Sequence, residues 1–279
     1  LSVSGGTAPY DYNWSNGDTT QNIDSIPTGL YSFVVTDTNG CTLIDSIDVL
    51  QPSAPLSLVS TVVDVLCFGG NNASISTVVS GGTTPYTYQW SNSEITDSIG
   101  GLIQGNYSIQ VLDSNLCSLD SSFVINQPSA PLLLSATSEE VLCFGGNDGS
   151  INVNVSGGIS PYTYLWNNGD TLSSINNIYS GFYILSVLDS NSCLYTDSFI
   201  VLEPTELVNI LNPISPTCNG FSNGSIISLT SGSVPPYSYL WNTGDTSQNL
   251  INIVAGQYSV VVNDSNNCSS FDTINISEP

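Results

Sequence analysis

Seven cysteines are the residues of this 279-residue chain whose type and spacing most directly imply chemistry. They form two alternating classes: one stands before a glycine turn, and the other closes an Asp-x-Asn-x-Cys turn. The first class is Cys67, Cys143 and Cys218, and the second is Cys41, Cys117, Cys193 and Cys268. Strict alternation predicts disulfides formed in an oxidising compartment. Without a CxxC motif or a histidine, thiolate-bound metal is not expected.

Three pairing schemes fit this alternation. Pairing within a repeat is the simplest and is the scheme we predict: Cys67–Cys117, Cys143–Cys193 and Cys218–Cys268, each 50 residues apart, with Cys41 unpaired. In a β-sandwich, however, the first and last turns lie at opposite ends, beyond the roughly 6 Å Cα spacing of a disulfide. A second scheme therefore joins neighbouring repeats, as Cys67–Cys193 and Cys143–Cys268. A third crosses the linkers, as Cys41–Cys67, Cys117–Cys143 and Cys193–Cys218.

The Asp-x-Asn turns are the second set of residues that could do chemistry. Their oxygen ligands would suit Ca²⁺, although no spacing matches a dedicated calcium loop. We prefer the simpler interpretation, an Asx turn between two strands, and expect no required cofactor, with calcium as the alternative. The candidate ligands are Asp37, Asn39, Asp113, Asn115, Asp189, Asn191, Asp264 and Asn266.

The charge composition excludes several function classes. The chain has no Lys, Arg or His against 23 acidic residues, for a formal charge of −23. Binding of nucleic-acid phosphates requires cations, as does attraction to anionic lipid. Catalysis by a His base or a Lys Schiff base is equally impossible. We therefore expect a protein that is not an enzyme, binds no nucleic acid and does not insert directly into a membrane.

A Pro-Tyr-x-Tyr-x-Trp string shows that the chain is built from repeats. It ends at Trp14, Trp90, Trp166 and Trp241, at intervals of 76, 76 and 75 residues. Such a period indicates an array of small like domains. A Gln-Pro or Glu-Pro dipeptide closes each copy. This predicts repeats at 53–128, 129–204 and 205–279, and a partial repeat at 1–52 that lacks its first strand and a half. We interpret the chain as an internal piece of a longer protein.

Within a repeat, apolar residues alternate with Ser, Thr, Asn and Asp, which is typical of strands. In the second copy we expect strands at 56–66, 74–80, 86–90, 107–112 and 118–126, and a short fourth strand within 95–102. Short strands with Gly, Pro and Asn turns predict an all-β fold, a tandem array of immunoglobulin-like sandwiches. The Trp falls on the third strand, and a Gly-x-Tyr resembling a tyrosine corner opens the fifth. We interpret the four Trp and these tyrosines as core markers: Tyr31, Tyr107, Tyr183 and Tyr258.

Several motifs together resemble the SprB repeat family. They are Cys-Phe-Gly-Gly-Asn-Asp-Gly-Ser (143–150), Ser-Gly-Gly-x-x-Pro-Tyr-Thr-Tyr-x-Trp (80–90 and 156–166), Asn-Gly-Asp-Thr (168–171), Gly-x-Tyr and Asp-x-Asn-Gly-Cys (37–41). The resemblance spans the chain. It implies a large cell-surface adhesin of Bacteroidetes, exported by the type IX secretion system and in some members moved by the gliding machinery. It carries over no catalytic residue. Family members normally contain Lys and Arg, so their absence is a departure.

The same phylum attaches O-glycans at Asp-Ser or Asp-Thr before a small or aliphatic residue. This implies candidate sites at Thr19, Ser25, Ser46, Ser98, Thr171 and Thr273.

The function we predict is a non-catalytic stalk segment of an extracellular adhesin filament. Its partners would be neighbouring repeats of the same chain and, in a filament, like chains; the polysaccharide or surface target is not specified by the sequence. Two alternatives remain: a polysaccharide-binding array, which requires exposed aromatic residues on one face, and a self-assembling fibre, which requires contacts between chains along an edge strand.

Overall fold

The computed structural model describes residues 1–279 and contains strands but no helices. Residues 53–128 hold six strands, and the same six recur twice further along the chain. The strands of the first set are β4 (Ser57–Val63), β5 (Ala73–Ser80), β6 (Thr87–Trp90), β7 (Ser98–Leu102), β8 (Gly105–Leu112) and β9 (Ser118–Ile125). No helix is present that could span a membrane.

The remaining strands follow the same order. Residues 129–204 contain β10 (Leu133–Glu139), β11 (Gly149–Ser156), β12 (Thr163–Trp166), β13 (Ser174–Ile178), β14 (Gly181–Leu188) and β15 (Leu194–Val201). Residues 205–279 contain β16 (Val208–Ile214), β17 (Gly224–Ser231), β18 (Ser238–Trp241), β19 (Leu250–Ile253), β20 (Gly256–Asn263) and β21 (Ser269–Ile276). Residues 1–52 contain only β1 (Asp11–Trp14), β2 (Gly29–Thr36) and β3 (Thr42–Val49).

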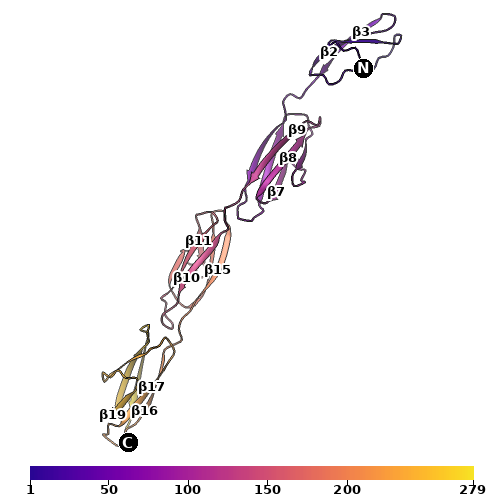
Figure 1. The fold of residues 1–279 in the computed structure, drawn as a ribbon. Helices are drawn as coiled ribbons and strands as arrows, with labels where there is room; N and C mark the ends of the chain where they lie inside the picture. The colour runs from indigo at the N-terminus through magenta and orange to yellow at the C-terminus, as the bar shows by residue number, and fades with distance from the viewer. The chain divides into compact units, whose positions relative to one another are not determined.

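Each six-stranded set forms two antiparallel three-stranded sheets. In residues 53–128 the orders are β4-β5-β7 and β6-β8-β9, and the later sets repeat them. In immunoglobulin nomenclature these are strands A-B-E and C-F-G, the constant-type sandwich without strand D. The all-β, immunoglobulin-like fold predicted from the sequence is therefore confirmed. Figure 1 labels β10, β11 and β15 in one such sandwich.

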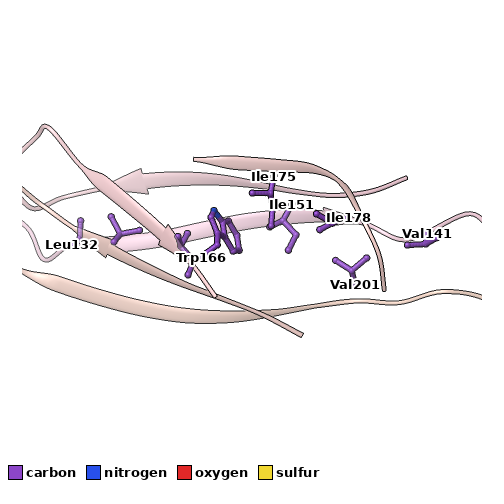
Figure 2. Packing of buried hydrophobic residues seen from close by; sticks show 9 residues of the cluster. Leu132, Val141, Ile151, Trp166, Ile175, Ile178 and Val201 are labelled. Carbon is purple, nitrogen blue, oxygen red and sulfur yellow. The ribbon is translucent and has the colours of Figure 1, made fainter. Parts of the chain in front are cut away.

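The core of each sandwich is built around its tryptophan. In residues 129–204, Trp166 lies near the middle of the buried cluster, with Ile151 and Ile175 beside it (Figure 2). Leu132 closes the cluster at one end and Val141 at the other (Figure 2). Alternation in the strands explains this arrangement, because every second side chain of a strand points inward.

Contacts along the chain group the residues into two compact units. One unit holds residues 1–64 and 71–126, and the other holds residues 65–70 and 127–279. The short segment 65–70 is grouped with the later part of the chain, to which the Cys67–Cys193 disulfide joins it. This segment contains Cys67.

Candidate functional site: the cysteine joints

Four equivalent turns, which we call the cysteine turns, are held by an aspartate side chain. They are Asp37–Cys41, Asp113–Cys117, Asp189–Cys193 and Asp264–Cys268. In Asp189–Cys193, one carboxylate oxygen accepts the backbone N–H groups of Asn191 and Cys193, both at 2.9 Å, and the other accepts that of Ile159 at 2.9 Å. The other three turns repeat this pattern. The Asx turn thus also binds the loop that follows the second strand.

These hydrogen bonds favour the ionised carboxylate. The backbone N–H of Thr83, followed by those of Cys117 and Asn115, holds the pKa of Asp113 below its ordinary value. For Asp264, burial acts to raise the pKa, but hydrogen bonds from the Ser233 hydroxyl and from backbone N–H groups outweigh it, so that the pKa is lowered. The Asp113 and Asp264 carboxylates therefore favour the ionised form.

Three equivalent loops, which we call the cysteine loops, carry the other class of cysteine. They are Cys67–Gly70, Cys143–Gly146 and Cys218–Phe221. Each is closed by a backbone hydrogen bond onto the carbonyl of its cysteine, from Gly70, Gly146 or Phe221. Each is also anchored to the end of its own repeat. The anchors are Gly69 N–H to Gln127 Oε1 (2.9 Å), Gly145 N–H to Glu203 Oε2 (2.6 Å) and Gly220 N–H to Glu278 Oε2 (2.8 Å).

Two disulfides join cysteine loops to cysteine turns of the following repeat. Cys67 bonds to Cys193 with a Cα separation of 5.7 Å, and Cys143 bonds to Cys268 with a Cα separation of 5.6 Å. The preferred within-repeat scheme, Cys67–Cys117, Cys143–Cys193 and Cys218–Cys268, is wrong. The scheme that joins neighbouring repeats describes the bonds that form.

The reason is the length of the strands. The Cys67 loop follows β4 at the end of the sandwich where Asn126 donates to Asp64. Cys117 lies at the opposite end of β9, before Ser118. Eight residues of strand span roughly 27 Å, several times the Cα spacing that a disulfide permits. The sandwich thus prevents the pairing that sequence distance favours.

An asparagine side chain adds a second contact at each bonded joint. The Asn191 Nδ2 donates to the Leu66 carbonyl at 2.9 Å, and the Asn266 Nδ2 donates to the Leu142 carbonyl at 3.0 Å. Each carbonyl belongs to the residue just before the loop cysteine. A bonded joint therefore has a covalent bond and a directional polar contact side by side.

Calcium binding by the turns stays the alternative prediction, and the turn aspartates have backbone partners of their own. The aspartate oxygens already face N–H groups, which a cation would have to displace. No three acidic, cysteine or histidine side chains gather in a group that could hold a metal. Asp37, Asn39, Asp113, Asn115, Asp189, Asn191, Asp264 and Asn266 form Asx turns.

The four tryptophans are buried, and each indole N–H donates to a carbonyl six residues on: Trp14 to Thr20, Trp90 to Thr96, Trp166 to Leu172 and Trp241 to Ser247. The Gly-x-Tyr tyrosines donate to a carbonyl four residues back: Tyr31 to Pro27, Tyr107 to Ile103, Tyr183 to Tyr179 and Tyr258 to Val254. This is the tyrosine-corner contact.

All six candidate glycosylation residues are exposed, and their modification stays a prediction.

Sequence reasoning missed the anchoring role of Gln127, Glu203 and Glu278. Their dipeptides were taken only as the ends of repeats. The available signal was the constant interval of 58 residues between each of these side chains and the loop glycine that it binds.

Comparison with known families agrees with the repeat motifs. A family model described as SprB repeat matches four segments, residues 1–19, 59–94, 135–171 and 212–246. Each of these four segments therefore carries the SprB repeat signature. Each matched segment ends within a few residues of the strand that carries the tryptophan. The SprB signature therefore covers the first half of each sandwich and does not include the cysteine turns. No curated protein sequence matches the chain.

Solved structures similar to this chain include other arrays of domains. The immunoglobulin domains 1–5 of Sidekick-1 align over 99% of this chain and 75% of that one, with 10% identity and a TM-score of 0.30. A tetra-tandem repeat from the extending region of a large adhesion protein aligns over 98% and 93%, with 14% identity and a TM-score of 0.28. At these scores the alignments carry no argument beyond the topology already described.

Proposed function

We propose that this chain is a load-bearing segment of an extracellular adhesin, in which disulfides between successive SprB repeats limit how far the segment can be stretched. The observation that carries the proposal is the pairing of Cys67 with Cys193 and of Cys143 with Cys268. Each bond encloses more than one repeat length of chain, at separations of 126 and 125 residues.

The covalent topology makes the two disulfides act in series. The shortest covalent path runs from Leu1 to Cys67, across to Cys193, back along the chain to Cys143, across to Cys268 and on to Pro279. This path contains about 130 residues instead of 279. Fully extended chain spans at most 3.3–3.6 Å per residue, so the limit is roughly 450 Å when oxidised and roughly 950 Å when reduced. When a tensile load unfolds the sandwiches, the residues that lie off this shortest path are therefore not stretched, because the disulfides carry the load past them.

The buried tryptophans and the net charge favour a spacer over a binding array, although other aromatic side chains, such as Phe144, Tyr179 and Phe221, are exposed. The four Trp side chains are buried and bonded to backbone carbonyls, so none offers a face on which a sugar could stack. A charge of −23 with no basic side chain favours mutual repulsion of chains over compact association. Disulfides belong to oxidising compartments, which supports an extracellular location.

The finer proposal follows the family resemblance. The segment would be part of a Bacteroidetes-type cell-surface filament, exported by the type IX secretion system and carried by gliding machinery where the cell has it. Its partners would be the neighbouring repeats and, in the filament, like chains. The site that binds the adhesive target would lie in another part of the protein.

Single-molecule stretching between handles at the two termini tests this proposal. The oxidised chain is expected to stop extending at roughly 450 Å, and addition of a reductant is expected to raise the limit to roughly 950 Å. The double variant Cys67→Ser, Cys143→Ser is the matched control and should reach the longer limit even when oxidised. Equal limits before and after reduction would show that the disulfides carry no load, and the proposal would fail.

A further inference from the structure

The four cysteine turns offer an internal comparison between occupied and unoccupied sites. The turns at Cys193 and Cys268 each hold a cysteine loop, whereas Cys41 and Cys117 are free and exposed. Nevertheless, the Asp37 and Asp113 carboxylates accept the same backbone N–H groups as Asp189 and Asp264. The receiving geometry is therefore formed before any loop arrives.

The turn asparagine distinguishes the two states. In the occupied turns the asparagine amide donates to the carbonyl before the loop cysteine. In the unoccupied turns, Asn115 Nδ2 donates to Thr83 Oγ1 at 3.0 Å, and Asn39 Nδ2 donates to Thr7 Oγ1 at 2.9 Å. The positions of Thr83 and Thr7 hold Ile159 and Val234 in the later repeats. The hydroxyl thus supplies a substitute partner where no loop carbonyl is present.

A cavity of about 480 Å³ opens beside Cys117. Its lining combines the linker residues Gln51 to Leu56 with Gly82, Asp113 and Ser118. In the bonded joint at Cys193, the equivalent cysteine is contacted by Cys67 and by Leu66 before it. A cavity of about 460 Å³ also lies beside the bonded Cys143–Cys268 pair, with the equivalent linker and turn residues in its lining. The Cys117 site therefore has the linker, the turn, the cavity and the thiol of a joint.

The unpaired Cys218 loop provides the complementary comparison. It keeps the closing hydrogen bond from Phe221 to the Cys218 carbonyl and the anchor from Gly220 to Glu278. Its cysteine is free and exposed. The loops, like the turns, thus have the same internal hydrogen bonds whether or not they are bonded.

We propose that the Cys117 turn is a receptor site for one specific partner, the cysteine loop of the repeat to which residues 1–52 belong. In both bonded joints the loop comes from the preceding repeat, 125 or 126 residues before its turn. The same interval places the donor cysteine of Cys117 before Leu1. The Cys41 turn is a receptor of the same kind, and the Cys218 loop is a donor to the turn of the repeat that follows it.

The bond forms by thiol–disulfide exchange with a disulfide oxidant of the compartment, such as oxidised glutathione. The loop thiolate first attacks the oxidant and releases one glutathione thiol. The Cys117 thiolate then attacks the mixed disulfide, the new S–S bond forms, and the second glutathione leaves as a thiol. The two cysteine thiols are oxidised, and one glutathione disulfide is reduced.

Competition for the three free thiols tests the receptor assignment. The 279-residue chain is mixed with a synthetic peptide of residues 65–72 whose cysteine carries a glutathione in a mixed disulfide. For each free thiol of the chain, the rate of disulfide exchange with this peptide is divided by its rate of exchange with oxidised glutathione. Cys117 and Cys41 are expected to prefer the peptide by at least tenfold, while Cys218, an equally exposed thiol on a donor loop, shows no preference. Asn115→Ala should reduce the preference at Cys117 alone. Equal relative rates at all three thiols would overturn the assignment.

A disulfide map of the native protein tests the source of the loop. Peptides that contain Cys117 are expected to be bonded to a cysteine loop that lies outside residues 1–279. A free Cys117, or Cys117 bonded to Cys218 of a second copy, would overturn the choice of the preceding repeat. Both tests are independent of load bearing, so they can fail while the stretching experiment succeeds, and the reverse also holds.

Discussion

Single glycines set how closely the second-strand turn can approach the linker. A Cβ placed on Gly157, whose φ is +69°, would lie 1.8 Å from the Pro131 carbonyl oxygen. A Cβ on Gly169, whose φ is +89°, would meet nothing within 4 Å. The two positions thus share a left-handed backbone, but only Gly157 also has a backbone atom against it.

This pair gives a matched prediction. Gly157→Ala should cost more than about 3 kcal/mol, because no rotamer change can relieve a clash with a backbone oxygen. Gly169→Ala should cost only about 1 kcal/mol, the strain of the left-handed conformation. Calorimetry of the oxidised chain measures each loss of stability as a shift in the unfolding temperature of the repeat at 129–204, which contains both glycines. Similar shifts in the two variants would contradict the close approach of linker and turn.

The turn aspartates give the chain a pH dependence with a definite sign. The pKa of Asp264 is lowered in the folded state. Its contribution to stability is therefore complete above the ordinary aspartate pKa of about 3.9 and is lost as the pH falls through the lower folded-state value. Asp264→Asn should lower the melting temperature by several degrees at pH 6, because an amide nitrogen cannot accept the hydrogen bonds that the carboxylate accepts.

That difference should narrow as the pH falls below about 3.9, where this aspartate becomes protonated in the unfolded chain, and should close as the pH falls through the lower folded-state pKa. Glu140→Gln is the control, because Glu140 is exposed and the substitution removes the same charge. A gap between Asp264→Asn and wild type that stayed constant from pH 6 to pH 2.5 would be incompatible with a buried, hydrogen-bonded carboxylate.

At the scale of elements, alternation in the sequence was enough to place the strands but not their ends. We expected a strand at 56–66 and a short one within 95–102, and the structure has Ser57–Val63 and Ser98–Leu102. The first strand ends early because Asp64 and the cysteine loop leave the sheet. The short fourth strand lies in the second part of its expected range, because the Glu94 and Thr96 carbonyls accept hydrogen bonds from the Trp90 backbone and indole. Hydrogen bonds of this kind, made by side chains and turns, do not change the alternation of apolar and polar residues, so the sequence pattern does not show them.

The cysteine joint was only partly predictable for a different reason. Spacing along the sequence favoured Cys67–Cys117, and only the separation of the two ends of a sandwich excludes it. The anchoring of the loop by Gln127 depends on a contact between residues 58 positions apart. The predicted sandwich was enough to raise the neighbour-joining scheme as an alternative, but the choice between the schemes and the Gln127 contact required the folded structure.

The tyrosine corner is the element-level contact that fixes the connection into β14. Tyr183 donates to the Tyr179 carbonyl at 2.9 Å, and burial raises the pKa of the Tyr183 phenol. Tyr183→Phe should cost about 1 kcal/mol, or about 4–8 °C for a domain of this size. Tyr195→Phe, which removes a hydroxyl from the neighbouring strand β15, should change little. Equal losses in thermal melts would mean that the corner hydrogen bond contributes nothing.

At the scale of the whole molecule, charge is of one sign. With no Lys, Arg or His, interactions between charged side chains are repulsive. Raising NaCl from 0.01 M to 0.15 M shortens the screening length from about 30 Å to about 8 Å and should raise the melting temperature. At equal ionic strength CaCl₂ and MgCl₂ should act alike. A melting temperature that fell as NaCl was added would contradict the claim that charge repulsion destabilises the chain. A melting temperature that rose with calcium but not with magnesium would contradict the interpretation of the Asp-x-Asn segments as Asx turns.

The central claim is that disulfides join the repeat at 53–128 to the repeat at 129–204, and that repeat to the one at 205–279. Peptic digestion without reductant, followed by mass spectrometry, tests it most directly, since a chain with no Lys or Arg offers trypsin no site. We predict peptides linked as Cys67–Cys193 and Cys143–Cys268, with Cys41, Cys117 and Cys218 as free thiols in the 279-residue chain. Peptides linked as Cys67–Cys117 and Cys143–Cys193 would contradict the account, because each repeat would then be closed on itself.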